Sequence, residues 1–443
     1  MYSSPKYEHL VDEINTKYMD SLVSRNPTLL EAAFMFHQSG RIPPNTYLLD
    51  LDAHRKNARM MVDEAAKHDV SLYFMSKQVN RNPLICKAVL AEGFSGMVAV
   101  EMQCARSLHR YGIKVSHVGH LVQVPVNDID YVLSMEPEVW TVYSFENARA
   151  ISERAQKTGR SQDLLVQPIG PDDLFFDSMS GGIPEGEIVQ TVQKINSLPG
   201  VRVVGTTSFP CMLYNIAAHE VRPISNFMTA VRAARTLEEE LGIEITQVNA
   251  PGNNHTTTMK TVAENGGTHA EPGSGMLGGN TAHTFHDEPE LPAFVYVTEV
   301  SHLLGDKAYA HGGGMAFPGG GWGLLPDGTL WEGGNRIAMD ALVGRDLASG
   351  RSNRLRSVLS SADPFNYNLP LQLNGKKAAV GDTVAYGFIT PQVFVSRSWN
   401  AVVEGISEND PRLLGVFDQG GHLVDSKGRP LGERAAIEIL EKV

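Results

Sequence analysis

Short apolar runs and amphipathic stretches alternate over roughly the first 280 residues of the chain. The apolar runs are typical of buried strands and predict them at residues 71–75, 96–100, 115–119, 139–143, 164–169, 201–206 and 243–249. The stretches between them carry apolar residues at helical spacing and predict helices at residues 52–68, 82–92, 103–111, 145–158 and 224–241. The pattern therefore predicts a repeated strand-helix unit.

Each unit spans roughly 20 to 35 residues, which is typical of a (β/α)8 TIM barrel. An open doubly wound sheet gives similar spacing, but the number of units favours a closed barrel. Residues 47–51 are expected to form a lead-in strand before the first helix, and residues 267–271 the eighth barrel strand. The predicted fold class is α/β, with the barrel at residues 46–285.

The pattern changes near Thr281. Glycine and proline clusters then separate the predicted strands, at residues 293–300, 308–317, 329–331, 383–388, 393–395 and 401–405. We therefore expect a mostly β C-terminal domain at residues 286–443. Residues 8–22 and 27–37 look helical and belong to an N-terminal helical segment, residues 1–45, which is expected to cap either the barrel or the β domain.

The composition narrows the class of protein. Of the 443 residues, 42% are hydrophobic and 20% charged, and no apolar run is long enough to cross a bilayer, so we expect a soluble protein without a membrane partner. The first residues do not resemble a secretory signal, which makes the cytoplasm the expected location. A formal net charge of -12 argues against a nucleic-acid partner. Three widely spaced cysteines predict neither disulfides nor a cysteine zinc site.

Lys77 follows the predicted strand 71–75 closely. Because burying a lysine is costly, a lysine at the end of a core strand suggests a chemical role. A desolvated amine has a lowered pKa and can form a Schiff base with a carbonyl cofactor. Taken alone, a solvated lysine in an ordinary loop is the commoner arrangement, so the other motifs decide between the two.

Two glycine-rich loops follow the last predicted barrel strands. Residues 249–258 (Asn-Ala-Pro-Gly-Asn-Asn-His-Thr-Thr-Thr) offer small residues, hydroxyl groups and the start of a predicted helix, which suit an anion. Residues 270–280 (Ala-Glu-Pro-Gly-Ser-Gly-Met-Leu-Gly-Gly-Asn) follow about twenty residues later. A polar capped loop would look the same for the first segment alone. Two such loops at consecutive strand ends, however, match the usual phosphate site of a barrel.

In this order, the motifs resemble those of the fold-type III pyridoxal-phosphate enzymes, which include alanine racemase and ornithine decarboxylase. The closer resemblance is to the YhfX-type branch of presumed amino-acid racemases. It is carried by residues 74–78 (Phe-Met-Ser-Lys-Gln), 271–273 (Glu-Pro-Gly) and 388–398 (Phe-Ile-Thr-Pro-Gln-Val-Phe-Val-Ser-Arg-Ser). The resemblance extends over roughly residues 45–405 and implies an alanine racemase-like barrel that binds pyridoxal 5'-phosphate.

The resemblance also implies a role for each motif. Lys77 would form the internal aldimine with pyridoxal phosphate and then act as acid or base at the substrate Cα. Glu271 would lie beside the pyridine nitrogen, where alanine racemase has an arginine, so a strict alanine-racemase mechanism is not implied. His120 would lie near the cofactor ring, although a structural histidine is the commoner case. The phosphate would be bound by Gly252, Asn254, His255 and Thr256 from one loop, by Ser274 and Gly275 from the other, and by Arg81.

A racemase needs a second acid or base on the opposite face of its planar intermediate. By the same resemblance, that group comes from the β domain of a partner subunit, so a homodimer with a shared active site is expected. Residues 308–314 (Ala-Tyr-Ala-His-Gly-Gly-Gly) lie where alanine racemase has its catalytic tyrosine, and Tyr309 or His311 is the candidate. Arg397 is expected to bind the carboxylate of the amino-acid substrate. A glycine-rich turn and an exposed strand arginine are the structural alternatives.

The sequence also bears on rival reactions of this fold. The ornithine-decarboxylase type has a cysteine in its β domain, whereas no cysteine follows Cys211. The D-threonine aldolase and D-serine dehydratase types bind a metal through a histidine paired with a cysteine or aspartate two residues on, and no such pairing appears after His302. His283 and His286 have metal-like spacing but are expected to be solvated, so no metal site is predicted.

A non-catalytic pyridoxal-phosphate-binding protein of this barrel type would lack the large β domain. We therefore expect an amino-acid racemase, with an amino-acid decarboxylase or a D-amino-acid lyase or aldolase of the same fold as the alternative. The identity of the amino acid stays open, because loops that one sequence cannot place decide side-chain specificity.

Overall fold

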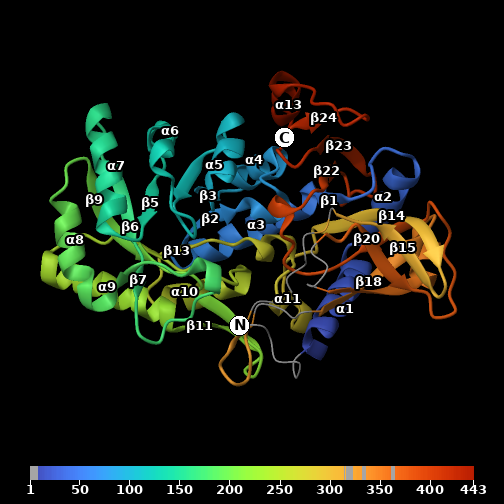
Figure 1. Ribbon diagram of the computed structural model, residues 1–443, viewed down its shortest axis with the longest axis horizontal. Coiled ribbons are helices and arrows are strands. Elements are labelled where there is room, and N and C mark those ends of the chain that lie inside the picture. The colour runs from blue at the N-terminus through green and yellow to red at the C-terminus, as the bar shows by residue number, and fades with distance from the viewer. Residues whose placement is uncertain (1–7, 314, 316–322, 332–335, 361–364) are drawn as a thin grey trace.

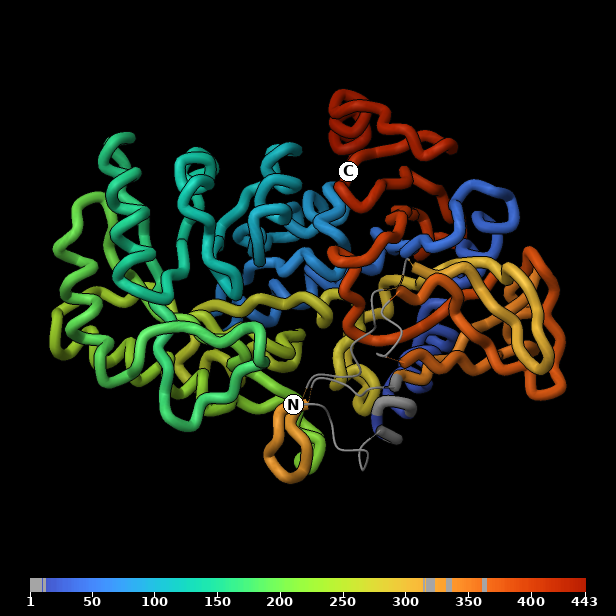
Figure 2. The backbone as a smooth tube through the Cα atoms, viewed as in Figure 1, coloured from blue at the N-terminus to red at the C-terminus, as the bar shows by residue number. Residues whose placement is uncertain are grey.

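The computed structural model describes residues 8–313, 315, 323–331, 336–360 and 365–443. The chain forms two bodies side by side, a barrel surrounded by helices and a large sheet (Figure 1). The same division is seen in the course of the backbone, which enters the sheet, makes the barrel and returns to the sheet (Figure 2). The two bodies meet where the candidate site residues lie.

The barrel is closed and all its strand pairs are parallel, which confirms the predicted fold class. Its eight strands are β2 (Ser71–Met75), β3 (Gly96–Ala99), β4 (Val115–Val118), β5 (Val139–Val142), β6 (Gln162–Val166), β9 (Val201–Thr207), β12 (Gln247–Asn249) and β13 (His269–Ala270). The predicted eighth strand at residues 267–271 is confirmed as β13, which pairs with β12 and β2. Because the strands are parallel, their carboxyl ends open on one face of the barrel, the usual location of an active site.

Helices lie between most of these strands and cover the outside of the barrel (Figure 1). They are α3 (Leu51–Ala66), α4 (Pro83–Ala91), α5 (Met102–Arg110), α6 (Ile129–Ser134), α7 (Phe145–Thr158), α8 (Ile188–Asn196), α9 (Ser225–Leu241) and α10 (Met259–Glu264). Local chemistry sets their starts. The side chain of Asn82 accepts hydrogen bonds from the amides of Leu84 and Ile85, and Pro83 occupies the first helical position of α4.

A ten-stranded sheet forms the second body. Its order is β15-β20-β19-β18-β21-β14-β1-β22-β23-β24, with a further pairing between β15 and β14. The strands are β1 (Thr46–Asp50), β14 (Phe294–Leu304), β15 (Lys307–His311), β18 (Arg336–Gly344), β19 (Arg354–Ser360), β20 (Asn368–Gln372), β21 (Thr383–Tyr386), β22 (Trp399–Glu404), β23 (Arg412–Phe417) and β24 (Leu423–Val424). The C-terminal part of the chain is therefore mostly β, as predicted.

The lead-in strand β1 belongs to this sheet and not to the barrel. It runs antiparallel to β14 and parallel to β22, and the barrel helix α3 begins at the next residue. The domain limits at residues 45/46 and 285/286 stay a prediction, since β1 ties the start of the predicted barrel segment to the C-terminal sheet.

The N-terminal helices pack on the sheet. Helix α1 (Glu8–Arg25) contacts β18, and α2 (Pro27–Gln38) contacts β14 and β21. Leu29, Leu30 and Phe34 join Val295 and Val297 in one buried apolar cluster. The sequence left open whether these helices cap the barrel or the β domain. They pack on the β domain.

Two details of the C-terminal domain differ from the sequence pattern. The strand predicted at residues 393–395 is wrong, because these residues form the 3-10 helix η8 (Val393–Val395), closed by hydrogen bonds from the amides of Val395 and Ser396 to the carbonyls of Gln392 and Val393. The strand predicted at residues 308–317 is present as β15 up to His311, while residues 314, 316 and 317 lie outside the described residues.

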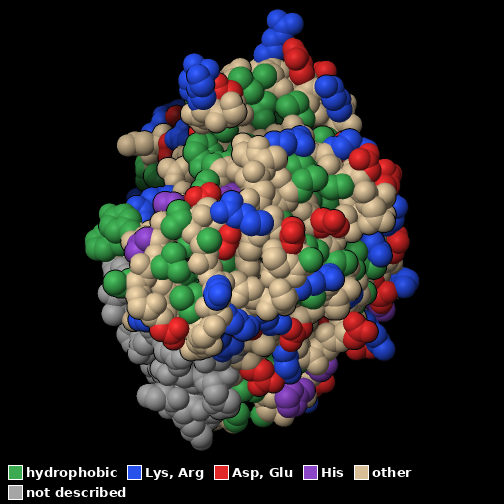
Figure 3. Space-filling model, turned by 90° about the vertical axis from the view of Figure 1, so that its right-hand side faces the viewer, with side chains coloured by type: hydrophobic (Ala, Val, Ile, Leu, Met, Phe, Trp, Pro, Cys, Tyr) green, Lys and Arg blue, Asp and Glu red, His purple; other side chains and the backbone are tan. Residues whose placement is uncertain are grey.

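The C-terminal domain exposes several apolar side chains. On the side of the sheet shown in Figure 3, hydrophobic side chains stand among charged ones. Leu304, Phe365, Tyr367 and Val395 of this domain are each at least 59% exposed, which is unusual for large apolar side chains. Within the described part of the chain, the structure contains no helix with the length and apolar character of a membrane span.

Candidate active site

Lys77 lies on the short 3-10 helix η2 (Ser76–Val79), directly after β2 and at the carboxyl end of the barrel. Only 8% of the residue is exposed. This desolvation lowers the pKa of Lys77 from its ordinary value of 10.5 to about 8. Its Nζ lies 5.9 Å from the centre of the Phe394 ring, which comes from η8 of the C-terminal domain. Lys77 is therefore the buried, weakly basic amine that the sequence suggested.

Glu271 follows β13 and is held by a polar network from neighbouring strands. His117 Nδ1 lies 2.6 Å from Glu271 Oε1, and Asn249 Nδ2 donates to the same oxygen at 2.8 Å. The other ring nitrogen of His117, Nε2, lies 2.6 Å from Thr141 Oγ1. Burial raises the pKa of Glu271, but His120 and His117 outweigh it and leave this pKa below its ordinary value. The buried carboxylate is therefore ionised at neutral pH.

The second oxygen of this carboxylate lacks a hydrogen-bond partner. Glu271 Oε2 and both ring nitrogens of His120 are buried and make no hydrogen bond to the described residues. His120 Nε2 lies 3.4 Å from Glu271 Oε2, and burial lowers the pKa of His120 to about 4. A buried oxygen without a donor fits a ligand that brings its own N–H group, as a protonated pyridine ring does.

The same three side chains also have donor atoms that suit a metal. The ligand atoms of His117, His120 and Glu271 all lie within 4.8 Å of one another, the single such group found in the described part of the chain. Lys77 and the two glycine-rich loops share this site, and neither is a feature that a metal requires. The complete set therefore fits pyridoxal phosphate better than a metal ion.

One cavity joins Lys77 to Gly252 of the first loop and to Glu271 and Ser274 of the second. It has an empty volume of about 540 Å3, open to solvent at one side. Both bodies of the molecule contribute, because Thr390 and Gln392 come from the segment before η8. Its lining consists of Met75, Lys77, Gln78, Leu121, Phe209, Leu213, Pro251, Gly252, Asn253, Glu271, Gly273, Ser274, Thr390 and Gln392.

The glycines of the two loops are needed for close packing. A Cβ atom at Gly252 would lie 2.2 Å from the carbonyl oxygen of Met212, and one at Gly275 would lie 2.1 Å from that of Asn254. At Gly273 it would lie 2.7 Å from Gln78 Oε1, a neighbour of Lys77. The loops therefore pack backbone against backbone beside the cavity, and Gly252 and Ser274 reach its lining.

Three residues predicted to bind phosphate have other partners in the structure. The amide and hydroxyl of Thr256 donate to Glu290 Oε1 at 2.6 and 2.5 Å. His255 Nδ1 lies 2.9 Å from the carbonyl of Asn253, and its Nε2 lies 3.4 Å from Glu288 Oε1. The Asn254 side chain bonds the carbonyl of Ala250 and the amide of Glu271. These side chains brace the loop, so the phosphate contacts expected of them are not supported by their geometry.

His283 differs from expectation in the same region. It is buried, with Nε2 3.0 Å from Glu290 Oε2 and Nδ1 2.7 Å from Asn280 Oδ1, whereas His286 is exposed. The expectation that both histidines are solvated is therefore wrong for His283, because two polar partners compensate its burial.

Arg81 lies outside the cavity lining as well. Its Nη2 donates to Asn80 Oδ1 at 2.6 Å and to the carbonyl of Gln419 at 2.9 Å. Its Nη1 lies 3.7 Å from Glu101 Oε1. The guanidinium predicted to bind phosphate is instead bonded to the turn between β23 and β24.

The three candidates from the β domain have contacts within that domain. Tyr309 lies on β15 between β14 and β20, where its ring stacks on His302 at 4.7 Å. His311 is exposed at the end of the same strand. The exposed Arg397 donates to the carbonyls of Gly313 and Phe365 at 3.1 and 3.0 Å. None of the three lines the cavity, so any catalytic role would have to be exerted in another subunit.

The sequence interpretation missed several polar residues. His117, Thr141 and Asn249 stand within or at the end of short apolar strands and carry the network around Glu271. The available signal was a polar side chain inside a buried strand, which requires a partner. Gln78 and Gln392 were noticed only as parts of motifs, and both line the cavity.

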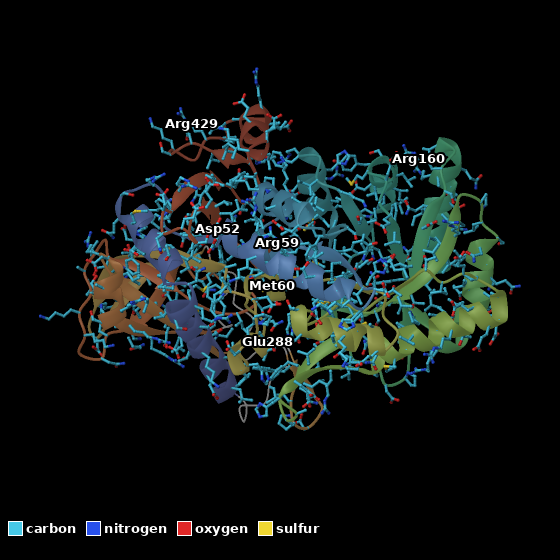
Figure 4. The ribbon with its side chains drawn as sticks, turned by 180° about the vertical axis from the view of Figure 1, so that it is seen from behind. Asp52, Arg59, Met60, Arg160, Glu288 and Arg429 are labelled. Carbon is cyan, nitrogen blue, oxygen red and sulfur yellow. The ribbon has the colours of Figure 1, made fainter. Side chains whose placement is uncertain are left out.

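A second, wider cavity lies at the back of the molecule, where Asp52, Arg59 and Met60 extend from α3 (Figure 4). Its empty volume is about 1240 Å3. Asp52 accepts from the amide and hydroxyl of Ser407, and Arg59 pairs with Glu92. These two charged side chains are therefore bonded to their neighbours. We assign the candidate active site to the cavity that contains Lys77.

A parallel barrel with a buried lysine and an ionised glutamate at its strand ends, followed by a β domain, defines a fold-type III pyridoxal-phosphate protein. The family model described as the N-terminal domain of alanine racemase matches residues 49–281. The uncharacterized protein YhfX of Escherichia coli (strain K12) is 32% identical over 405 residues, 91% of this chain and 99% of that protein. The chain therefore belongs to the alanine racemase family, and pyridoxal phosphate is the cofactor of that family.

Solved structures of several activities share the fold. D-threonine aldolase from Filomicrobium marinum has a TM-score of 0.63 at 16% identity, covering 85% of this chain and 94% of that chain. Alanine racemase of Clostridium difficile 630, in complex with cycloserine, has a TM-score of 0.57 at 15% identity, covering 85% and 99%. D-threo-3-hydroxyaspartate dehydratase from Delftia sp. HT23 has a TM-score of 0.56 at 14% identity, covering 84% and 96%. At these identities the likeness concerns the fold alone.

Proposed function

We propose that this protein is a pyridoxal-phosphate-dependent amino-acid racemase in which Lys77 binds the cofactor and transfers a proton at the substrate Cα. The observation that carries the proposal is the placement of Lys77, with its pKa lowered to about 8, in one cavity with Glu271. A lysine in this state is a competent nucleophile and a competent base near neutral pH.

The residues present would hold the cofactor at three points. Lys77 would hold its aldehyde carbon, and Glu271 Oε2 would accept the N–H of its pyridine ring. Gly252, Gly273 and Ser274 line the same cavity and would face the phosphate. When bound, pyridoxal phosphate supplies an electron sink that makes the Cα proton of an amino acid acidic.

The protein's own groups supply the proton chemistry. Lys77 would remove or return the Cα proton on the face of the substrate that it touches. The ionised Glu271, fixed by His117 and Asn249, would hold positive charge at the pyridine ring. Leu121, Phe209 and Leu213 form an apolar wall that limits water in the cavity.

The opposite face requires a second group, and the described lining of this chain's own cavity does not provide it. Among the described lining residues, Lys77 and Glu271 are the ionisable ones. We therefore propose a homodimer in which Tyr309 or His311 of one subunit completes the site of the other. The exposed apolar side chains of the C-terminal domain support a subunit contact there. Arg397 would serve the substrate carboxylate if assembly releases it from Gly313 and Phe365.

A lyase or aldolase acting on a D-amino acid, or a decarboxylase, is the second candidate. The same observation favours it, because decarboxylation, side-chain cleavage or elimination needs proton transfer at Cα on one face only, which Lys77 could supply. The two candidates therefore differ in whether a second acid or base is present.

Two measurements test the proposal in order. Purified protein should show the absorbance of lysine-bound pyridoxal phosphate, which borohydride reduction abolishes and which Lys77→Ala lacks. Wild-type protein without this band after incubation with the cofactor would refute the cofactor assignment. Solvent deuterium should then enter Cα of a substrate amino acid that keeps both its carboxylate and its side chain. A screen that yields only decarboxylation or side-chain cleavage would replace the racemase with the second candidate.

A further inference from the structure

The short helix that carries Lys77 ends in an unusual backbone. Asn80 and Arg81 follow one another with φ angles of 52° and 55°, the left-handed region that residues other than glycine seldom adopt. Both residues are nearly fully buried. Their amides close the Lys77 turn, since Asn80 N donates to the carbonyl of Lys77 at 3.2 Å and Arg81 N to that of Ser76 at 2.9 Å. The conformation of Lys77 thus depends on two strained residues.

The C-terminal end of the chain holds this strained pair. Asn80 Nδ2 donates to the carbonyls of Asp418 and Gln419 at 3.3 and 3.2 Å, and Arg81 Nη2 donates to that of Gln419 at 2.9 Å. The contacts join residues more than 330 positions apart in the sequence. Backbone strain persists only where the surroundings fix it, and here the turn between β23 and β24 does so.

The turn itself, residues 418–422, is rigidly built. Asp418 Oδ1 accepts from the amides of Gly420 and His422, both at 2.8 Å. From the barrel side, Arg110 Nη1 donates to the carbonyl of Gly420 at 3.2 Å, and the Tyr111 hydroxyl to that of Gly421 at 2.8 Å. In Figure 1 the C-terminal segment lies above α4, which the last helix, α13 (Glu433–Leu440), contacts. The turn is therefore docked on the barrel by contacts independent of Asn80 and Arg81.

We propose that the turn at residues 418–422 is a positioning element for Lys77, acting through Asn80 and Arg81. The inference rests on the proposed role of Lys77 as the cofactor lysine. It gives Arg81 a positioning role in place of a phosphate contact. Without the turn, η2 loses the bonds that hold its left-handed end, and the Lys77 amine samples positions away from the cavity.

Two variants test this link. Asn80→Gly keeps the left-handed backbone accessible and removes the side-chain bonds to the turn, together with the Asn80 Oδ1 that accepts from Arg81 Nη2. Arg81→Met removes the guanidinium while keeping the apolar stem. Arg412→Met is the matched control, since Arg412 lies on β23 of the same hairpin but pairs with Glu404 and Asp410 at the surface.

The first readout uses apoprotein. Amide hydrogen exchange of residues 76–82 should become at least about tenfold faster in both variants and stay unchanged in Arg412→Met. The second readout is pyridoxal-phosphate binding followed by absorbance, where the dissociation constant should rise about tenfold for Arg81→Met and a few-fold for Asn80→Gly.

Several results would overturn the proposal. If the amide hydrogens of residues 76–82 exchange in both variants at the wild-type rate, the turn does not hold η2. If cofactor binding is weaker in Arg81→Met alone and amide hydrogen exchange is unchanged, Arg81 contacts the phosphate and does not position Lys77. A lowered thermal midpoint with unchanged cofactor affinity would leave the turn a purely structural role. If wild-type protein binds no pyridoxal phosphate, the proposed function fails, whereas the exchange measurement still decides whether the turn holds the Lys77 helix.

Discussion

Lys77 should reduce the stability of the apoprotein, and its removal should raise it. Lys77→Met replaces the buried amine with an apolar side chain of similar length. The pKa of Lys77 is lowered to about 8 in the folded protein, against an ordinary value of 10.5, so the unfolded chain binds the proton more tightly. We predict that Lys77→Met unfolds at a higher denaturant concentration than the wild type at neutral pH.

The expected magnitude follows from the two pKa values. Their difference of about 2.5 corresponds to about 3 kcal/mol at pH 7, because one pKa unit is equivalent to about 1.4 kcal/mol. Below pH 8 the amine is charged in both the folded and the unfolded protein, so burying it reduces the folding stability by the full amount. As pH rises from 8 to 10.5, the folded amine deprotonates before the unfolded one, and the cost falls to about 1 kcal/mol at pH 10. Above pH 10.5 it disappears.

Urea unfolding of the wild-type and Lys77→Met apoproteins, measured between pH 6 and 10.5, would provide the test. Lys194→Met is the matched control, because Lys194 is exposed at the end of α8, and its stability should differ from wild type by less than about 0.5 kcal/mol. A Lys77→Met protein no more stable than wild type at pH 7 would refute the reasoning. So would a stability difference that does not shrink as pH rises.

Three further predictions concern the site. Glu271→Gln should lower the racemisation rate by about two orders of magnitude in steady-state assays, since a neutral amide cannot hold charge at the pyridine ring; a wild-type rate would contradict this. Gly275→Ala should destabilise the protein by about 1–3 kcal/mol in urea unfolding, because the added Cβ would lie 2.1 Å from the carbonyl oxygen of Asn254. Gly186→Ala, whose Cβ would meet nothing within 4 Å, serves as its control, and equal effects of the two would be inconsistent with the packing argument. Mixing inactive Lys77→Ala with an inactive Tyr309→Phe/His311→Gln double variant should restore up to about a quarter of wild-type activity if subunits share sites; no recovery after subunit exchange would argue against sharing.

The barrel was predictable because its strands are short, apolar and evenly spaced. The run at residues 71–75 matches β2 at both ends, and the predicted eighth strand at residues 267–271 contains β13. Tertiary pairing was harder to infer. The pattern at residues 47–51 identifies a strand but cannot indicate that β1 pairs with β14 and β22, far away in the sequence. The valines of η8 have strand propensity, yet local turn bonds prevail there.

In the candidate site, the sequence predicts which residues lie at the strand ends, but it does not predict where their side chains point. Lys77, Glu271, Gly252 and Ser274 lie where strand ends must meet, and they share one cavity. Thr256 belongs to the same loop as Gly252, but its amide and hydroxyl point to Glu290. The resemblance to alanine racemase predicts Arg81 at the phosphate, whereas its left-handed backbone turns it toward the C-terminal turn. A single sequence contains no signal for such orientations.

The relation between the two bodies is itself part of the site. Barrel residues and the segment at Thr390 and Gln392 line one cavity together, so its shape depends on how barrel and sheet are joined. Asp50, the last residue of β1, fixes that joint, because its Oδ1 accepts from the first turn of α3 at Ala53 and its Oδ2 from Asn26 between the N-terminal helices. A strand paired on both sides and capped directly into a barrel helix leaves no linker on which the bodies could swing apart. Substrate entry by domain opening would break these contacts, and we therefore expect the amino acid to enter through the solvent-open side of the cavity while barrel and sheet stay joined.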